Sequence, residues 1–135
     1  MKSKITRDGQ VTPKEIEDLR AVIGWDRCEG TYESILCKHF AYYIARADDY
    51  GLIGYVSVLC DGISNAFLLD LMVHPEYQKA RLGIHLVRTA VKDLKQAGIR
   101  CVQVTFNDDL EPFYKQCGFH IFKGGIIDFK NMDWE

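Results

Sequence analysis

The sequence predicts an α+β fold in which a mixed, mostly antiparallel central sheet of six to seven strands is flanked by about four helices. Strand-like apolar segments follow one another between residues 40 and 73, and short turns separate them. Residues 82–97 instead carry apolar side chains at spacings of three and four, the pattern of an amphipathic helix. Short turns predict antiparallel neighbours, and a helix between two strands predicts one parallel crossover.

The individual elements follow from local signals. Thr12-Pro13-Lys14-Glu15 starts a helix, because Thr can cap it, Pro suits its first position and Glu completes a capping box. Gly24 is the expected end of that helix. Further helices are expected over 31–38, 82–97 and from Asn107 to Gly118. The expected strands are 3–8, 40–45, 52–59, 66–73, 101–106, 120–123 and 126–129.

Length and composition indicate one domain over residues 1–135 and exclude several classes of protein. A net charge of −2 provides no general attraction to nucleic acid or to an anionic membrane. No apolar run approaches the roughly 18 residues of a membrane span, and the N-terminus lacks an apolar signal region. The five cysteines form no Cys-x-x-Cys pair and the four histidines do not have the spacing of metal ligands, so no metal is expected. Scattered cysteines of this kind predict a cytoplasmic location.

The stretch from Val73 to Val87 organises the chain. An apolar strand stops at Pro75, a basic segment containing Lys79 and Arg81 follows, and the helical pattern begins at Leu82. The free amides at a helix start, together with the helix dipole, form an anion site. This segment therefore predicts that the chain binds a phosphate-bearing ligand.

Two motifs in this order resemble the GCN5-related N-acetyltransferase (GNAT) superfamily. The segment Gln78-Lys-Ala-Arg81-Leu-Gly83 occupies the place of the family's pyrophosphate loop, Gln/Arg-x-x-Gly-x-Gly/Ala. The family's later motif is matched by Asn107, Phe113-Tyr114 and Gly118-Phe119. The resemblance covers nearly the whole chain and is densest over residues 52–119.

The resemblance implies an acetyl-CoA-dependent N-acyltransferase that moves an acetyl group directly to a primary amine of a small molecule. In similar enzymes the pantetheine arm pairs with the strand before the loop, and the loop amides hold the diphosphate. The implied acetyl-CoA contacts are Leu71, Met72, Val73, Gln78, Lys79, Ala80, Arg81, Leu82, Gly83, Ile84, Asn107 and Phe113.

The loop departs from the family pattern at Arg81, where the first glycine is expected. A Cβ atom there can crowd the diphosphate, since glycine permits close backbone approach. The guanidinium can also strengthen binding, because its fork of donors suits phosphate.

Two residues are candidates for the proton transfers of the reaction. Tyr114 matches the family's tyrosine that protonates the departing CoA thiolate, and the alternative is a tyrosine that only packs its helix. Asp70, the one carboxylate in an otherwise apolar strand, is the candidate base, and the alternative is a structural hydrogen-bond acceptor.

The acceptor has no motif of its own in this sequence. Trp25 is expected to cover the core, with a place in the substrate pocket as the alternative, and Tyr32 and Tyr42 are further aromatic candidates for that pocket. Other readings are a protein or peptide N-acetyltransferase and a non-catalytic CoA-binding sensor with a degenerate loop. Dimerisation is common among similar proteins, so a homodimer is a possible assembly, although no segment requires it.

Overall fold

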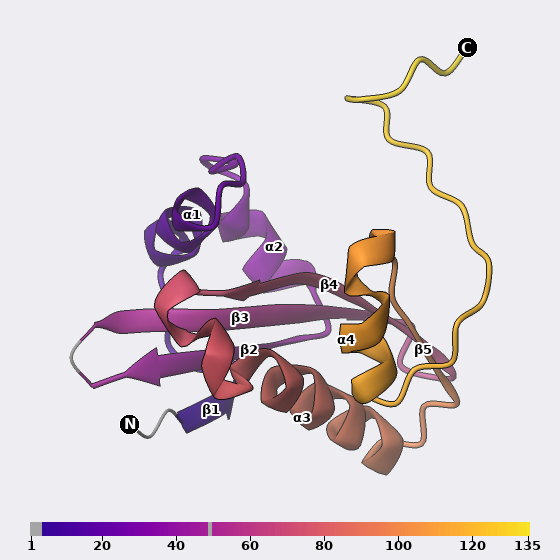
Figure 1. Cartoon of the computed structure of the whole chain (residues 1–135), viewed down its shortest axis with the longest axis horizontal. Helices are drawn as coiled ribbons and strands as arrows, with labels where there is room; N and C mark the ends of the chain where they lie inside the picture. The colour runs from indigo at the N-terminus through magenta and orange to yellow at the C-terminus, as the bar shows by residue number, and fades with distance from the viewer. Residues whose placement is uncertain (1–3, 49) are drawn as a thin grey trace. The chain divides into compact units, whose positions relative to one another are not determined.

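Five strands form one sheet in the order β1-β2-β3-β4-β5 (Figure 1). The computed structural model describes residues 4–48 and 50–135. Strands β1 to β4 pair antiparallel, and β5 pairs parallel with β4, so the predicted mixed and mostly antiparallel sheet is confirmed. The strands are β1 Lys4–Arg7, β2 Ala41–Ala47, β3 Gly51–Cys60, β4 Asn65–Val73 and β5 Cys101–Gln103.

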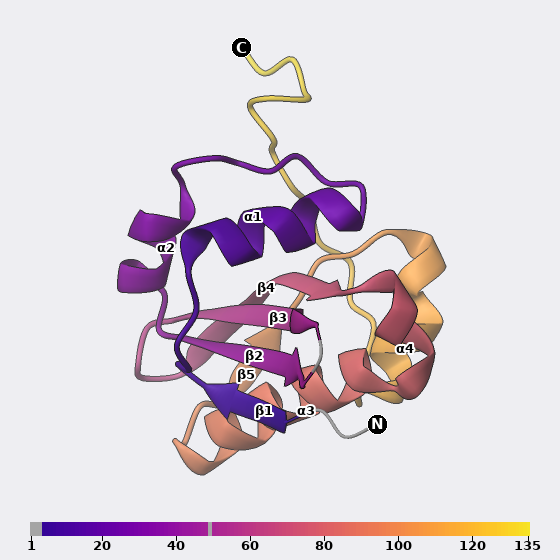
Figure 2. The ribbon, with the colours of Figure 1, turned by 90° about the vertical axis from the view of Figure 1, so that its left-hand side faces the viewer.

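Helices cover both faces of this sheet. Helices α1 (Pro13–Val22) and α2 (Tyr32–Lys38) lie on one face, and α3 (Leu82–Gln96) lies on the other, as two perpendicular views show (Figure 2). On the first face, side chains of both helices join those of β2, β3 and β4 in a buried cluster. On the second face Gly54 allows close approach, because a Cβ atom there would lie 2.8 Å from Leu86.

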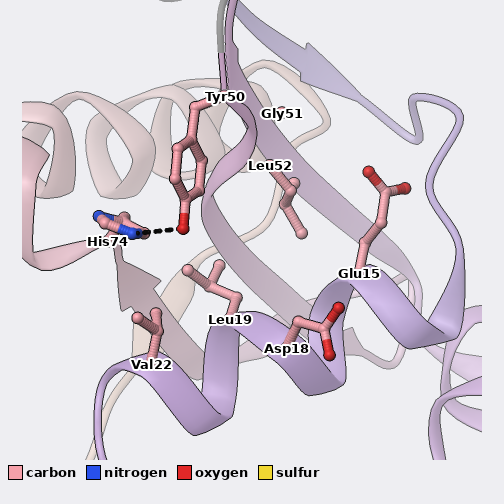
Figure 3. Close-up of a pocket in the computed structure, with 8 residues that line it drawn as sticks. All are labelled: Glu15, Asp18, Leu19, Val22, Tyr50, Gly51, Leu52 and His74. Carbon is pink, nitrogen blue, oxygen red and sulfur yellow. Dashed lines mark hydrogen bonds between the residues drawn. The ribbon is translucent and has the colours of Figure 1, made fainter.

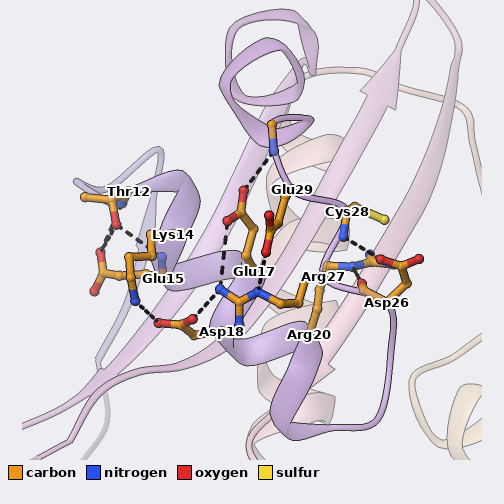
Figure 4. A network of polar contacts seen from close by, with 11 residues as sticks. Thr12, Lys14, Glu15, Glu17, Asp18, Arg20, Asp26, Arg27, Cys28 and Glu29 are labelled. Atoms are coloured by element: carbon orange, nitrogen blue, oxygen red, sulfur yellow. Dashed lines mark hydrogen bonds and ion pairs between the residues drawn. The ribbon is translucent and has the colours of Figure 1, made fainter.

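A dense set of polar contacts holds α1 and the loop after it. The predicted capping box is present: the Glu15 amide donates to Thr12 Oγ1 at 3.2 Å, and the Thr12 amide donates to Glu15 Oε1 at 3.0 Å. Arg27 in the loop pairs with Asp18 of α1 at 2.6 Å and with Glu29 at 3.3 Å (Figure 4). These contacts tie the loop between α1 and α2 to the first helix.

A β-bulge interrupts the pairing of β3 with β4. Tyr55 pairs with Met72 and Ser57 pairs with Leu69, so one residue of β3 faces two residues of β4. Asp70 lies in this bulge with a φ of 57°, a left-handed conformation that aspartate tolerates better than most residues. The bulge interrupts the alternation of side chains along β4. Asp70 lies on the side of the sheet covered by α1 and α2, where it accepts a hydrogen bond from the Tyr32 hydroxyl of α2.

Contacts within the chain divide it into two compact units, residues 1–104 and residues 105–135. The second unit contains a short 3-10 turn, η2 (Asp108–Leu110), and helix α4 (Glu111–Gln116). The strands predicted over 120–123 and 126–129 are wrong, because residues 119–135 contain no strand. An isolated two-stranded hairpin is marginal in water, and Gly124 and Gly125 add backbone entropy at its turn. The sheet therefore has five described strands rather than six to seven.

Candidate active site

The outer edge of β4 is open where the site is expected. Strand β5 pairs only with residues Asn65 to Phe67 of β4, although β4 continues to Val73. In the described part of the chain, no strand pairs with the remaining 68–73 stretch on that side. An extended ligand could therefore form backbone hydrogen bonds along this edge. Leu71, Met72 and Val73, the predicted pantetheine contacts, all belong to it.

The loop after β4 is a 3-10 turn, η1 (Pro75–Ala80), and it is anchored at both ends. His74 accepts a hydrogen bond from the Glu76 amide at 3.2 Å and caps the turn. The Gln78 side chain donates to the Val73 carbonyl at 3.0 Å, so it fixes the loop to the end of β4. Arg81 then enters α3 in a left-handed conformation with a φ of 61°.

The first turn of α3 has the geometry of an anion site. The first backbone hydrogen bond of the helix runs from the His85 amide to the Arg81 carbonyl at 3.1 Å, so the amides of 82–84 precede the hydrogen-bonded ladder. No side chain at Arg81 caps them. Lys79 and Arg81 are exposed beside this turn. Free amides, the helix dipole and two cations together fit a diphosphate.

Asp70 is at the centre of a polar cluster on the α1–α2 face. The Tyr32 hydroxyl donates to Asp70 Oδ2 at 2.9 Å, and Arg20 Nη1 lies 3.9 Å from the same oxygen. Arg20 also donates to the Tyr32 hydroxyl at 2.9 Å, which closes a three-residue network. Burial, followed by the charge of Asp70, raises the pKa of the Tyr32 phenol, so that phenol is protonated at neutral pH. The structure thus provides Asp70 with the contacts of a structural acceptor.

Trp25 does not cover the core as expected. Its side chain is 41% exposed, and the Arg20 guanidinium lies over its ring at 5.2 Å from the centroid. The reason is Gly24, whose φ of 89° turns the chain outward directly after α1. Trp25 is therefore a surface aromatic on the side of the sheet that carries Asp70.

The remaining predicted site residues lie in 105–135. Tyr114 is buried, and its ring stacks on Phe106 at 4.6 Å and meets Phe113 edge-on at 4.9 Å. Burial, with a smaller effect of Cys117, raises the pKa of Tyr114 to about 12. Asn107 occupies the cap position of η2, but its side chain makes no capping hydrogen bond, which leaves the amide available to a ligand.

A pocket of about 240 Å³ opens between α1, the start of β3 and His74 (Figure 3). His74 donates or accepts a 2.8 Å hydrogen bond with the Tyr50 hydroxyl at its wall. The two carboxylates at its rim are already paired, Glu15 with Arg46 and Asp18 with Lys14 and Arg27. The pocket is lined by Glu15, Asp18, Leu19, Val22, Tyr50, Gly51, Leu52 and His74.

The structure thus places ten of the predicted cofactor contacts on one continuous strand–turn–helix segment, from Leu71 to Ile84. Sequence reasoning did not predict that Arg20 and Tyr32 contact Asp70, or that His39 and Ser57 lie beside this cluster. Arg20 comes from α1, and His39 lies at the end of α2, 2.8 Å from the Ser57 hydroxyl. The available signal was the alternation of β3, which places Tyr55 and Ser57 on one face.

Comparison with known families decides what this segment belongs to. Residues 38–121 match the model of the acetyltransferase (GNAT) domain, which is more than half of the chain. The chain belongs to the GNAT family. As a GNAT-type acetyltransferase it is an acyltransferase, and the open β4 edge, the turn and the start of α3 all lie within the matched residues.

Named relatives and solved structures agree with the GNAT assignment. The chain is 28% identical to an uncharacterized N-acetyltransferase ycf52 of Porphyra purpurea over 89% of its length and 70% of that protein. It is 35% identical to the chloroplastic GCN5-related N-acetyltransferase 2 of Arabidopsis thaliana, over 62% of this chain and 31% of the other. A GNAT-family acetyltransferase from Streptococcus pneumoniae TIGR4 superposes with a TM-score of 0.79 and 25% identity, over 94% of this chain and 98% of that one. Glucosamine-6-phosphate N-acetyltransferase of Arabidopsis thaliana shares the fold, with a TM-score of 0.77 and 14% identity over 95% and 98% of the two chains.

Two further observations concern the GNAT domain as described. Its residues 4–48 and 50–135 contain no group of three or more His, Cys, Asp or Glu side chains arranged to hold a metal ion. No helix in the same ranges has the length and apolar character needed to cross a membrane.

Proposed function

We propose that this GNAT protein transfers an acetyl group from acetyl-CoA directly to a primary amine of a small molecule. The observation that carries the proposal is the open edge of β4 from residue 68 to Val73, which leads into the anion-binding start of α3. A pantetheine arm needs an extended edge with free backbone groups, and a diphosphate needs free amides beside positive charge. This segment supplies both in the right order.

Each predicted contact then has a proposed role. Leu71, Met72 and Val73 act through their backbone groups, since the Met72 side chain is buried in the core. The amides of 82–84 hold the diphosphate, and Arg81 adds a fork of donors to it. Gln78 keeps the loop in place through Val73.

Tyr114 is proposed as the acid that protonates the departing thiolate, with Asn107 and Phe113 as further cofactor contacts. The raised pKa of Tyr114, about 12, supports this role, because the phenol then carries its proton throughout the neutral range. Its hydroxyl makes no hydrogen bond to any described residue, so it is available as a donor. Asp70 is proposed as the catalytic carboxylate on the acceptor side.

A small and partly apolar amine is the proposed acceptor. The exposed Trp25 ring and the buried Tyr32 ring lie on the face that carries Asp70, and Arg20 contacts both rings. Protein or peptide acetylation needs an open groove over the loop between α1 and α2. That loop is instead held to α1 by the ion pair of Arg27 with Asp18, which favours the small acceptor.

The test is release of free thiol from acetyl-CoA in the presence of a panel of primary amines, histone-tail peptides and no acceptor. Acceptor-dependent release with small amines supports the proposal, and release with peptides alone supports the protein acetyltransferase. Heat of acetyl-CoA binding without release from any acceptor identifies a non-catalytic sensor. No binding heat at all removes the cofactor assignment.

Three further properties complete the proposal. Residues 1–135 form one catalytic domain, since the family match at 38–121 extends across both compact units. The protein acts in the cytoplasm, an inference supported by its five cysteines, which form no disulfide in the described part of the chain, and testable by cell fractionation. It forms a homodimer, which is supported by seven large apolar side chains between Ile121 and Trp134 that are each at least 42% exposed.

A further inference from the structure

A hydrogen-bonded histidine–serine pair lies beside the bulge of β4. His39 follows the end of α2, and its Nδ1 atom lies 2.8 Å from the Ser57 hydroxyl. Ser57 is completely buried in β3 and pairs with Leu69, the residue directly before Asp70. The pair therefore lies one residue along the sheet from the carboxylate that is proposed to face the acceptor.

One oxygen of the Asp70 carboxylate is already engaged. Oδ2 accepts the hydroxyl of Tyr32 at 2.9 Å and lies 3.9 Å from the Arg20 guanidinium. A carboxylate that is held by a donor and a cation is well placed to bind and orient an ammonium group. Its contacts do not favour the additional task of removing that group's proton.

His39 has the properties that a proton acceptor needs. Burial lowers the pKa of its imidazole, and the nearby charge of Asp70 opposes this to a smaller extent, so the ring is neutral at pH 7. The phenols of Tyr32 and Tyr55 on the same face have pKa values raised by burial, so they stay uncharged. Ser57 holds Nδ1, whereas Nε2 makes no hydrogen bond within the described ranges. The ring is only half-buried and can pass a proton on to solvent.

A second observation marks this face as a place for a polar ligand. The Tyr55 hydroxyl is fully buried and makes no hydrogen bond to a described residue. Tyr55 lies two positions before Ser57 on the same face of β3, and its ring meets that of Tyr32 edge-on at 6.0 Å. Because an unpaired buried hydroxyl is unfavourable, a polar group bound beside it would be stabilising.

We propose that His39 is the general base that takes the proton from the acceptor ammonium while Asp70 holds and orients that ammonium. The inference rests on the proposed acetyl transfer and assigns its base. The ammonium loses one proton to Nε2, and the neutral amine forms the C–N bond at the thioester carbonyl. The C–S bond then breaks and the departing thiolate takes up a proton from its acid. The nitrogen loses its second proton, which restores the proton on that acid. His39 returns its proton to solvent, so one amide, one thiol and one proton are the products.

The test compares two acceptors, benzylamine and hydroxylamine, in the wild type and in a variant of His39. Benzylamine is an ammonium at neutral pH and needs a base, whereas hydroxylamine is already uncharged and needs none. His39→Asn places an amide where Nδ1 lies and so keeps a partner for Ser57, but it removes Nε2. We expect a decrease in kcat/KM of about 100-fold or more with benzylamine, and of less than about fivefold with hydroxylamine. In the variant the limb set by the imidazole should disappear, and the reaction with benzylamine should instead rise with pH in proportion to the uncharged amine.

Matched measurements separate this role from a structural one. His120→Gln replaces an exposed histidine outside the site and should leave both reactions unchanged. Ser57→Ala should decrease the benzylamine reaction more than the hydroxylamine reaction, since the imidazole loses its fixed orientation. Equal losses with both acceptors, or an acidic limb that keeps its wild-type position in His39→Asn, would overturn the assignment while leaving the transferase intact. A wild type that transfers acetyl to neither acceptor nor to any amine of the panel would overturn both proposals.

Discussion

The Tyr32 hydroxyl donates a 2.9 Å hydrogen bond to the Asp70 carboxylate and so joins α2 to the bulge of β4. The bond exists because two local features agree. The bulge and the positive φ of Asp70 place its side chain on the α1–α2 side, and α2 presents a buried tyrosine there. A helix in the N-terminal part of the chain thereby positions a carboxylate on the strand that is proposed to hold the cofactor.

Removal of this hydroxyl should affect stability and turnover together. Tyr32→Phe is expected to lower the free energy of unfolding by about 1–2 kcal/mol, because two part-buried hydrogen bonds are lost, one to Asp70 and one from Arg20. We also expect kcat/KM for an amine to decrease by about tenfold, with acetyl-CoA affinity unchanged. Urea unfolding, steady-state kinetics and calorimetry provide the three measurements.

The control for this variant is another tyrosine–aspartate pair on the opposite face. The Tyr43 hydroxyl donates to Asp93 of α3 at 2.8 Å. Tyr43→Phe should lose similar stability and retain full activity. Similar losses of activity in both variants would mean that only overall stability matters, and that Asp70 has no special orientation to keep.

Arg81 should have opposite effects on stability and on cofactor binding. Its φ of 61° is a conformation that glycine adopts without cost, so Arg81→Gly is expected to raise the free energy of unfolding by about 0.5–1 kcal/mol. The same change removes the guanidinium beside the diphosphate site, and the Kd for acetyl-CoA should increase by about fivefold. Thermal unfolding and isothermal titration measure the two effects.

Arg81→Ala separates the two causes, since it keeps a Cβ atom in the same backbone conformation. It should weaken acetyl-CoA binding as much as Arg81→Gly does, without the gain in stability. Tighter binding in Arg81→Gly alone would show that the Cβ atom crowds the diphosphate, contrary to the favourable role proposed for the arginine.

Tyr114→Phe should affect chemistry and leave stability nearly unchanged. The ring contacts with Phe106 and Phe113 remain in the variant, and no hydrogen bond to a described residue is lost. We expect kcat to decrease by about 10- to 100-fold if the phenol protonates the thiolate. Because its pKa is raised to about 12, this acid should produce no basic limb below about pH 11 in the wild-type profile. Unchanged turnover of a good substrate by the variant would remove the role.

The sequence predicted the segment from β4 to α3 well, and for a physical reason. A strand that ends at Pro75 and a helix with a regular apolar stripe are local patterns, so both elements and their order could be predicted from the sequence. The antiparallel strands β1 to β4 and the parallel strand β5 were predictable for the same reason. The polar cluster around Asp70 was not, because its members come from α1, α2 and β3, which meet β4 only through tertiary packing.

The bulge at Asp70 and the left-handed backbone at Arg81 also escaped sequence reasoning. Non-glycine residues rarely adopt a positive φ, so nothing in the composition of either segment indicates it. The strands expected at 120–123 and 126–129 failed for the converse reason. Their apolar composition is strand-like, but pairing depends on neighbours that composition does not specify.

The pair formed by Glu15 and Arg46 should make stability depend on pH in the acidic range. Two hydrogen bonds from Arg46, at 2.6 and 2.9 Å, lower the pKa of Glu15 to about 2, against an ordinary value near 4.5. The stabilisation is therefore present above about pH 4.5 and is lost as the pH decreases through about 2. Since a third of the Glu15 side chain is exposed, Glu15→Gln should cost only about 1 kcal/mol at pH 7.

Urea unfolding at pH 7 and near pH 2 measures this difference for Glu15. The variant should be less stable than the wild type at pH 7, and the two should converge near pH 2. Asp18→Asn serves as the control, because that carboxylate is also paired but takes no part in the capping box. A difference that stays constant between the two pH values would place the cost in the cap geometry rather than in the charge.

The exposed apolar residues of the C-terminal segment should hold two copies of the chain together. Phe122 is 87% exposed, Phe129 76% and Ile126 67%, and such residues rarely remain in contact with water. We expect the wild type to sediment as a dimer at micromolar concentration, and Phe122→Asp with Ile126→Asp to sediment as a monomer. Ile63→Asp is the matched control, since Ile63 is 79% exposed in the turn before β4, and this variant should remain dimeric. A monomeric wild type would mean that these side chains are covered within one chain, and a dimeric double variant would place the interface elsewhere.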